Sequence, residues 1–175
     1  MNAVEEPPVM NVVVHPTPVG PLHLASDGAS LVACEFEGYE RGIAHRVLRE
    51  RTASAADAVI DLARRELDAF FEGRLRAFTV PVAPRGTDFQ RKVWSALREI
   101  PYGETWSYGA LAKRIGSPAA VRAVGAANGQ NPVCIVVPCH RVIGADGSLT
   151  GFGGGLPRKR YLLALERGER PLMMA

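Results

Sequence analysis

The sequence changes character at the segment Ala83-Pro84-Arg85-Gly86, and this change limits the possible folds more than any other feature. Before it, β-branched and apolar residues alternate with polar ones, as in antiparallel strands. After it, apolar residues recur at helical spacing between short loops. Proline and glycine at the change are typical of a linker. We therefore expect two domains, residues 1–83 and residues 84–175.

The first domain is expected to contain a small antiparallel sheet followed by a helix. From Val12 to Glu37 the alternating pattern is broken by turn residues such as Pro18-Val19-Gly20-Pro21, which indicates a meander. The segment Ser54 to Asp57 resembles a capping box, and the helix that it begins should stop at Gly73. A short strand is expected near residues 78–82.

The second domain is expected to be mostly helical. Its first helix should be capped by Thr87 or Asp88. Two short helices follow, one from Ser107 to Ile115 and one from Pro118 to Asn128, and Ser117 is expected to cap the second. Two short helices separated by so few residues have the spacing of a helix-turn-helix.

The second helix of this pair has a surface of small residues. Alanines occupy positions 119, 123, 126 and 127, and Arg122 is the exception among them as a long polar side chain. Such a surface lets the backbone approach a partner closely, which suits the narrow minor groove of duplex DNA and predicts binding without sequence preference. It would equally suit tight packing inside the protein, so the helix alone leaves both interpretations open.

Residues 131–138 form an apolar, β-branched run, for which we expect a strand that ends at Cys139. An isolated cysteine is most often a small buried hydrophobe, and that interpretation suits Cys34 and Cys134. Cys139 differs because His140 adjoins it, and a base beside a thiol raises the fraction of reactive thiolate. The sequence therefore makes Cys139 a candidate nucleophile.

A zinc site is the alternative interpretation of this segment. It would use Cys134, Cys139 and His140, but their spacing is not that of a zinc knuckle and no fourth ligand is apparent. No metal is therefore expected.

Composition excludes several classes of protein. The 175 residues, 47% of them hydrophobic, suffice for a core without disulfide staples. Three cysteines and the absence of a basic region followed by an apolar stretch at the N-terminus predict a cytoplasmic protein. No apolar run approaches the roughly 20 residues of a membrane span. A net charge of +3 is compatible with a polyanionic partner without requiring one.

The last helix, expected to open at Pro157, has its charges placed against the helix dipole. The basic run Arg158 to Arg160 lies in the first turn and Glu166 in the last. Basic residues beside the glycine run Gly151 to Gly155 would suit phosphate contacts, and Glu166 would suit the orientation of a histidine. Solvated charge is the alternative.

Together these residues resemble the O6-alkylguanine-DNA alkyltransferase family, DNA-repair proteins that remove alkyl groups from guanine and are consumed in doing so. The resemblance lies in PCHRV at Pro138 to Val142, in Asn131-Pro132 before it, and in a glycine-rich loop and a helix ending in Leu-Glu after it. It extends over the second domain, whereas the first resembles the family only in general layout. It implies an α/β protein with an RNase H-like N-terminal domain and a mostly helical C-terminal domain whose helix-turn-helix is winged-helix-like.

The resemblance also implies catalytic roles. Cys139 matches the acceptor whose thiolate attacks the alkyl carbon at guanine O6. His140, acting through a water, matches the base that takes the thiol proton, and Glu166 matches the carboxylate that orients the imidazole. The implied outcome is a single-turnover transfer from O6-alkylguanine, and by extension O4-alkylthymine, in duplex DNA.

Further roles follow from the same resemblance. Tyr108 matches the phenol that donates to guanine N3 and helps to rotate the nucleotide out of the duplex, while Arg122 matches the finger that takes its place in the stack. Asn131 matches a hinge between the helix-turn-helix and the active-site segment. The remaining implied contacts are Ala119, Ala123, Ala126 and Ala127 with DNA, and Trp106, Val142, Phe152 and Gly153 with the alkylated base.

The chain departs from the family pattern in its glycine-rich loop. Phe152 stands where a tyrosine is common, and the glycine at 153 carries no hydroxyl, so contacts to O6 are expected from the backbone. The zinc-binding residues of mammalian members have no evident counterparts, and no cofactor is implied. The expected partner is duplex DNA carrying O6-alkylguanine, bound by a monomer, with cooperative assembly on DNA left open.

Two alternatives belong to other functional classes. One is a binding protein that recognises alkylated bases without repairing them, although such proteins carry tryptophan at the position of Cys139. The other is a thiol hydrolase that uses Cys139, His140 and Glu166, in which the helix-turn-helix would have no purpose.

Overall fold

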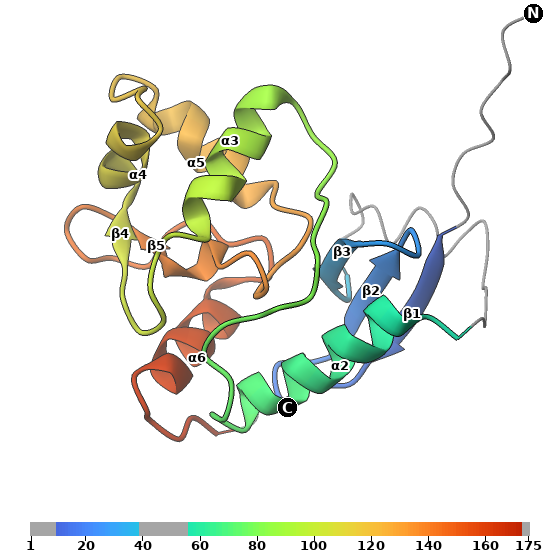
Figure 1. Ribbon diagram of the computed structural model, residues 1–175. Coiled ribbons are helices and arrows are strands. Elements are labelled where there is room, and N and C mark those ends of the chain that lie inside the picture. Colours follow the sequence, from blue (N-terminus) through green and yellow to red (C-terminus); the bar gives the residue numbers. More distant parts are fainter. Residues whose placement is uncertain (1–9, 39–55, 173–175) are drawn as a thin grey trace, which may run out of the picture.

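The computed structural model describes residues 10–38 and 56–172, and its first part is a three-stranded antiparallel sheet covered by a helix (Figure 1). Strands β1 (Asn11–His15), β2 (Leu22–Ser26) and β3 (Leu31–Phe36) are paired in the order β1-β2-β3. The predicted meander is therefore confirmed. Helix α2 (Ala58–Phe71) packs on this sheet.

Helix α2 begins at Asp57, whose carboxylate accepts the backbone N–H groups of Val59 and Ile60. Ser54, the predicted start of the capping box, lies outside the described residues. At the other end of the helix Gly73 has a φ of 73°, a conformation that favours glycine. The predicted stop at this glycine is confirmed.

The predicted strand near residues 78–82 is wrong, since only an isolated bridge between Val82 and Leu31 is present. The segment still lies along β3, where Leu31 donates to the Pro81 carbonyl at 2.8 Å. Thr79 and Val80 instead donate their backbone N–H groups to the Glu66 carboxylate at 3.0 Å. The Glu66 carboxylate thus accepts hydrogen bonds from the backbone N–H groups that a β-ladder would use.

The second part is mostly helical, as predicted. Helix α3 (Asp88–Leu97) begins with a capping box of Thr87 and Gln90, and helix α4 (Tyr108–Arg114) is capped by Ser107. Helix α5 (Val121–Gly129) packs against both (Figure 1), and helix α6 (Leu156–Glu166) follows the glycine-rich loop. The short strands β4 (Trp106–Ser107) and β5 (Val142–Ile143) pair in parallel.

Helix α5 begins later than the sequence predicted. Residues 117–120 form a turn closed by the hydrogen bond from the Ala120 N–H to the Ser117 carbonyl, and Ala120 is the residue before the helix. Ser117 and Pro118 are therefore turn residues and not the cap and first residue of the helix.

Residues 131–138 do not form the predicted strand. The segment makes isolated bridges, from Cys34 to Val133 and from Cys134 to Val137. Its pairing with β3 consists of two hydrogen bonds of 2.8 Å, from Cys34 N–H to Pro132 O and from Cys134 N–H to Cys34 O. Beyond this contact the chain turns sharply at Ile135, whose φ is 71°.

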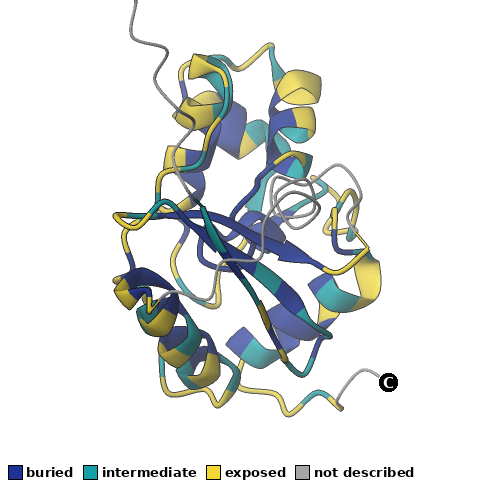
Figure 2. Ribbon diagram, turned by 90° about the vertical axis from the view of Figure 1, so that its right-hand side faces the viewer, coloured by how far each residue is buried: buried dark blue, intermediate teal, exposed yellow. Residues whose placement is uncertain are grey.

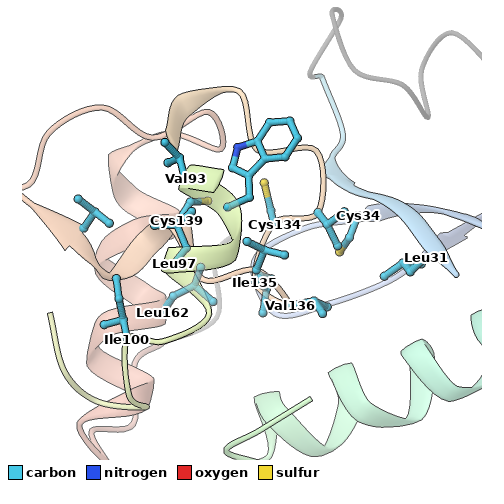
Figure 3. Close-up of a cluster of buried hydrophobic side chains, with 14 of the residues drawn as sticks. Leu31, Cys34, Val93, Leu97, Ile100, Cys134, Ile135, Val136, Cys139 and Leu162 are labelled. Carbon is cyan, nitrogen blue, oxygen red and sulfur yellow. The ribbon is translucent and has the colours of Figure 1, made fainter. Parts of the chain in front are cut away.

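One hydrophobic core joins the two parts of the molecule. In Figure 3 the labelled members come from strand β3, helices α3 and α6, the loop after α3 at Ile100, and residues 134–139. Figure 2 shows the buried sides of the helices turned inward and their exposed sides turned to solvent. The first part therefore packs directly beneath the segment that carries Cys139.

The described residues contain neither a membrane-spanning helix nor a cluster of metal ligands. No helix there is long and apolar enough to cross a bilayer. Nor do three or more histidine, cysteine or acidic side chains gather there as a metal site would require.

Candidate active site

Cys139 is the first residue of a single 3-10 turn, Cys139–Arg141, and is 3% exposed. Its N–H donates to the Val137 carbonyl at 2.8 Å across Pro138, whose φ of −82° and ψ of 64° define an inverse γ-turn. The Asn128 side chain also contacts the Cys139 carbonyl, at 3.4 Å. Hydrogen bonds thus hold both the N–H and the carbonyl of Cys139.

The surroundings of Cys139 favour its thiolate. A hydrogen bond from the Cys134 thiol makes the largest contribution and lowers the pKa of Cys139 below its ordinary value. Burial opposes this change, while a hydrogen bond from Asn131 and the positive charge of Lys159 support it. The pKa of Cys139 is lowered despite complete burial, which is typical of a reactive cysteine and not of an inert one.

His140 is fully buried and is oriented by Glu166. The distance from its Nε2 to Glu166 Oε1 is 2.7 Å, and Nδ1 has no hydrogen-bond partner among the described residues. The Glu166 carboxylate can only accept a hydrogen bond, so Nε2 carries the proton and the neutral ring has its lone pair on Nδ1. Burial lowers the pKa of His140 against the effect of Glu166, and the neutral ring is therefore an available base.

Glu166 is the centre of a buried polar network. It accepts hydrogen bonds from His140, from the Arg141 guanidinium at 2.9 Å and from the Gly103 N–H at 3.0 Å. Burial disfavours its charge, but the bonds from His140 and Arg141 outweigh burial and lower its pKa to about 2. A carboxylate held by three donors can fix the imidazole without becoming protonated.

Cys139 opens on a pocket of about 10 Å³, which is room for about one water molecule. Of the predicted base-contacting residues, Gly153 lines this pocket and Phe152 packs edge to face on Phe36, with ring centroids 5.7 Å apart. Trp106 and Val142 instead pair with each other between β4 and β5. Asn131, which the sequence predicted as a hinge, also lines the pocket. The remaining lining residues, which sequence reasoning missed, are Glu35, Phe36, Asn128, Gly129, Cys134 and Gly154.

The two lining residues from strand β3 could not be found from a motif, because only the fold brings them to the site. The ring of Phe36 lies so close to Gly154 that a Cβ at that glycine would come within 2.5 Å of it. Glycine at 154 therefore allows the loop to approach the first part of the chain.

Tyr108 and Asn131 both contact the backbone of this site. The Tyr108 hydroxyl donates to the Thr150 carbonyl at 3.0 Å, so it lies against the glycine-rich loop. Asn131 donates to the Val137 carbonyl at 2.8 Å and accepts from the Val133 N–H at 3.0 Å. It thus closes the turn that precedes Cys139.

Lys159 belongs to the site, although the sequence analysis assigned it to phosphate contacts. It is fully buried, and its ammonium donates to the carbonyls of Val142 at 2.5 Å and Thr150 at 2.8 Å. Burial lowers its pKa to about 8, while the Cys139 thiolate opposes that shift. The neighbouring Arg158 also points inward, to the Val19 carbonyl at 2.7 Å. The predicted phosphate role of these two residues is therefore wrong.

One face of α5 and the turn before it matches the surface expected for DNA. Arg122 is exposed, and so are Ala119, Ala123 and Ala126. Ala127 is 3% exposed and lies in the core, where its carbonyl accepts the Trp94 Nε1–H at 2.8 Å. We therefore leave Ala127 out of the proposed DNA-contacting surface.

Fold and site together define a two-part α/β protein in which a buried, activated thiol lies beneath a helix-turn-helix. The chain matches the 6-O-methylguanine DNA methyltransferase ribonuclease-like domain over residues 13–84 and the DNA-binding domain of the same family over residues 88–168. It therefore belongs to the 6-O-methylguanine DNA methyltransferase family. The predicted family and fold class are confirmed.

Relatives and solved structures agree with this assignment. A methylated-DNA–protein-cysteine methyltransferase of Mycobacterium tuberculosis is 50% identical over 157 residues, 89% of this chain and 91% of the relative. One from Methanosarcina acetivorans is 46% identical over 163 residues, 90% of this chain and 98% of the relative. The crystal structure of M. tuberculosis O6-methylguanine methyltransferase superposes with a TM-score of 0.81 at 47% identity, covering 93% and 96% of the two chains. The structure of M. tuberculosis OGT in complex with DNA gives 0.76 at 46% identity, covering 93% and 94%.

Proposed function

We propose that this protein repairs DNA by direct reversal, transferring the alkyl group of O6-alkylguanine in duplex DNA to Cys139. The observation that carries the proposal is the arrangement of the site: the buried Cys139 thiol is followed in the chain by His140, whose ring is fixed by Glu166 at 2.7 Å. The lowered pKa of Cys139 supports it. A hydrolase would need only these three groups, whereas the exposed face of α5 supports a DNA substrate. Family membership and the DNA complex of a relative support the same partner.

The proposed reaction is an in-line displacement. The Cys139 thiolate forms an S–C bond to the alkyl carbon as the C–O6 bond breaks, and its proton passes to His140 Nδ1 through a bridging water. The electron pair of the broken bond returns to the guanine ring, where the Tyr108 hydroxyl neutralises it by donating to N3. The thioether has no route back to a thiol, so each molecule acts once. O4-alkylthymine is proposed as a second substrate.

The base reaches Cys139 only outside the stack. Extrusion costs a few kcal/mol, less for a lesion that pairs badly. Arg122 is proposed to occupy the space that the base leaves, while the alanine face at 119, 123 and 126 lies in the minor groove and binds with salt-dependent, sequence-indifferent affinity. We propose a cytoplasmic monomer as the acting species.

The test is intact-protein and peptide mass spectrometry after mixing the protein with a duplex that contains one O6-methylguanine. We expect one methyl group per protein molecule, on the peptide that holds Cys139, and none for Cys139→Ser, which should still bind the duplex. Tight binding of the lesion without an adduct would instead identify a recognition protein. Repeated turnover of a small ester would identify a hydrolase.

A further inference from the structure

The structure holds a second thiol, Cys134, beside Cys139. Both line the same small pocket, and their side chains share a hydrogen bond. The Cys134 sulfur also lies 3.6 Å from the Asn131 carbonyl, so its S–H group has two acceptors within reach. In the view of Figure 3 Cys134 is drawn between Cys139 and Cys34, within one buried cluster.

The backbone brings the two cysteines together by turning sharply twice within five residues. The Val136 N–H donates to the Cys134 carbonyl at 2.9 Å across Ile135, which closes one γ-turn. The Cys139 N–H donates to the Val137 carbonyl at 2.8 Å across Pro138, which closes a second. An extended strand would instead have placed the residues roughly 17 Å apart along its axis.

This arrangement requires a strained backbone conformation at Ile135. Ile135 is the one non-glycine residue among the described residues with a positive φ, and a β-branched side chain is strained there. The Asn131 amide stabilises the turn, because it bonds the Val133 N–H at 3.0 Å and the Val137 carbonyl at 2.8 Å. The juxtaposition of the two thiols is therefore built into the fold.

We propose that Cys134 is a resolving thiol for Cys139, and that a small hydroperoxide converts the pair into a reversible disulfide. The Cys139 thiolate attacks one peroxide oxygen, the O–O bond breaks, and Cys139 becomes a sulfenic acid. The other oxygen takes up the proton that the thiol lost and leaves as water or an alcohol. The Cys134 sulfur then bonds to the Cys139 sulfur. The sulfenic hydroxyl leaves with the Cys134 proton as water.

The environment of each thiol suits one of these two steps. The hydrogen bonds that lower the pKa of Cys139 make it the one that oxidises first. The hydrogen bond to Cys139, burial and the negative charge of Cys139 all raise the pKa of Cys134, and oxidation of Cys139 to a neutral sulfenic acid removes that charge. The Cys134 thiol therefore becomes more acidic once Cys139 is a sulfenic acid, which is the step in which Cys134 attacks. A pocket with room for about one water favours hydrogen peroxide over larger hydroperoxides.

The consequence for repair rests on the proposed function of Cys139. A disulfide would withhold the acceptor thiol without consuming the protein, and a dithiol reductant would return it. It would also protect Cys139 from sulfinic acid, which ordinary thiols do not reverse.

The test uses the reduced, full-length protein and hydrogen peroxide. Trypsin leaves Cys134 and Cys139 on one peptide, residues 123–141, and Cys34 on another. We expect peroxide to remove two hydrogens from peptide 123–141 and to block both of its cysteines against maleimide, with reversal by dithiothreitol. A matched control, Cys34→Ala, alters another buried cysteine and should give the same disulfide.

Cys134→Ala should be unable to form the bond and should proceed to sulfinic acid at Cys139. After peroxide and then dithiothreitol, its recovered methyl-transfer capacity should be roughly tenfold below that of the wild type. Sulfinic acid at Cys139 in the wild type without a disulfide, or a disulfide to Cys34, would overturn the proposal. The mass change is measured without DNA, so it tests the disulfide proposal independently of alkyl transfer. The digest of the wild-type protein tests the proposal even if the Cys134→Ala variant does not fold.

Discussion

At the scale of single residues, the reactivity of Cys139 depends on groups that donate to it or face it. Cys134 and Asn131 donate hydrogen bonds, and Lys159 supplies a positive charge from a fully buried position. His140 supplies none of these effects directly, since its Nε2 is bonded to Glu166. Activation of the thiol and acceptance of its proton are therefore separate tasks of different side chains.

Replacement of Lys159 by methionine tests the role of the buried charge. We expect the pKa of Cys139 to rise, because a nearby opposite charge no longer favours the thiolate. The measurement is the rate of Cys139 methylation by methyl iodide across the pH range, followed by mass spectrometry. In the wild type the lysine contribution should fade as pH rises through about 8, the pKa of Lys159.

The control for this prediction is Lys113→Met, which removes an exposed cation from α4. Its methylation profile should coincide with that of the wild type. A Lys159→Met profile with an unchanged midpoint would show that the ammonium only ties the loop carbonyls of Val142 and Thr150.

Glu166→Gln is expected to destabilise the fold as well as to loosen the orientation of the His140 imidazole. It leaves the buried Arg141 guanidinium without its counter-charge, a change that typically costs 3–5 kcal/mol, on the order of 4 here. The folded pKa of about 2 lies below the ordinary 4.5, so the stabilisation is complete above pH 4.5. It is lost as the pH falls toward 2. Urea unfolding between pH 2 and 7 measures both effects.

Glu99→Gln is the matched control, because it removes the carboxylate of an exposed pair with Arg114. It should change the free energy of unfolding by less than about 1 kcal/mol. If the two variants lost stability equally, the burial of the network would have no energetic significance.

At the scale of elements, the sequence predicted most helices and failed at the segments whose shape depends on distant partners. The Thr87 cap of α3 and the Ser107 cap of α4 are local signals, and both are confirmed. Residues 131–138 have strong strand propensity, yet strand β3 and the Asn131 amide fold them into turns. For the same reason Cys139 was predictable as a candidate, whereas the contribution of Cys134 was not.

Helix α5 carries the element-scale prediction. Arg122→Ala should slow alkyl transfer from duplex DNA far more than transfer from free O6-methylguanine, because only the duplex requires base extrusion. Single-turnover rates on the two substrates measure this, and we expect a loss of tenfold or more on duplex, which corresponds to at least about 1.4 kcal/mol. Arg114→Ala, which alters an exposed arginine at the end of α4, is the control. Equal losses on both substrates would contradict the proposed finger role.

At the scale of the whole molecule, the division expected between residues 83 and 84 does not separate two cores. Strand β3 bonds the chain before Cys139, and Phe36 packs against Gly154 and Phe152. Arg158 adds a contact, with its guanidinium 4.9 Å from the Phe36 ring centroid. The first part thus forms one wall of the active site, a role that its sequence did not reveal because no motif marks it.

This shared core predicts one cooperative unfolding transition. Cys34 lies in β3 and is fully buried, so its labelling by iodoacetamide follows the first part, while fluorescence of Trp94 and Trp106 follows the second. In urea the two probes should give the same midpoint, because neither part can expose its side of the core alone. Arg158→Ala should lower both midpoints together. Labelling of Cys34 at urea concentrations that leave the fluorescence unchanged would mean that the first part opens independently, and the active-site wall that it supplies would then be a transient one.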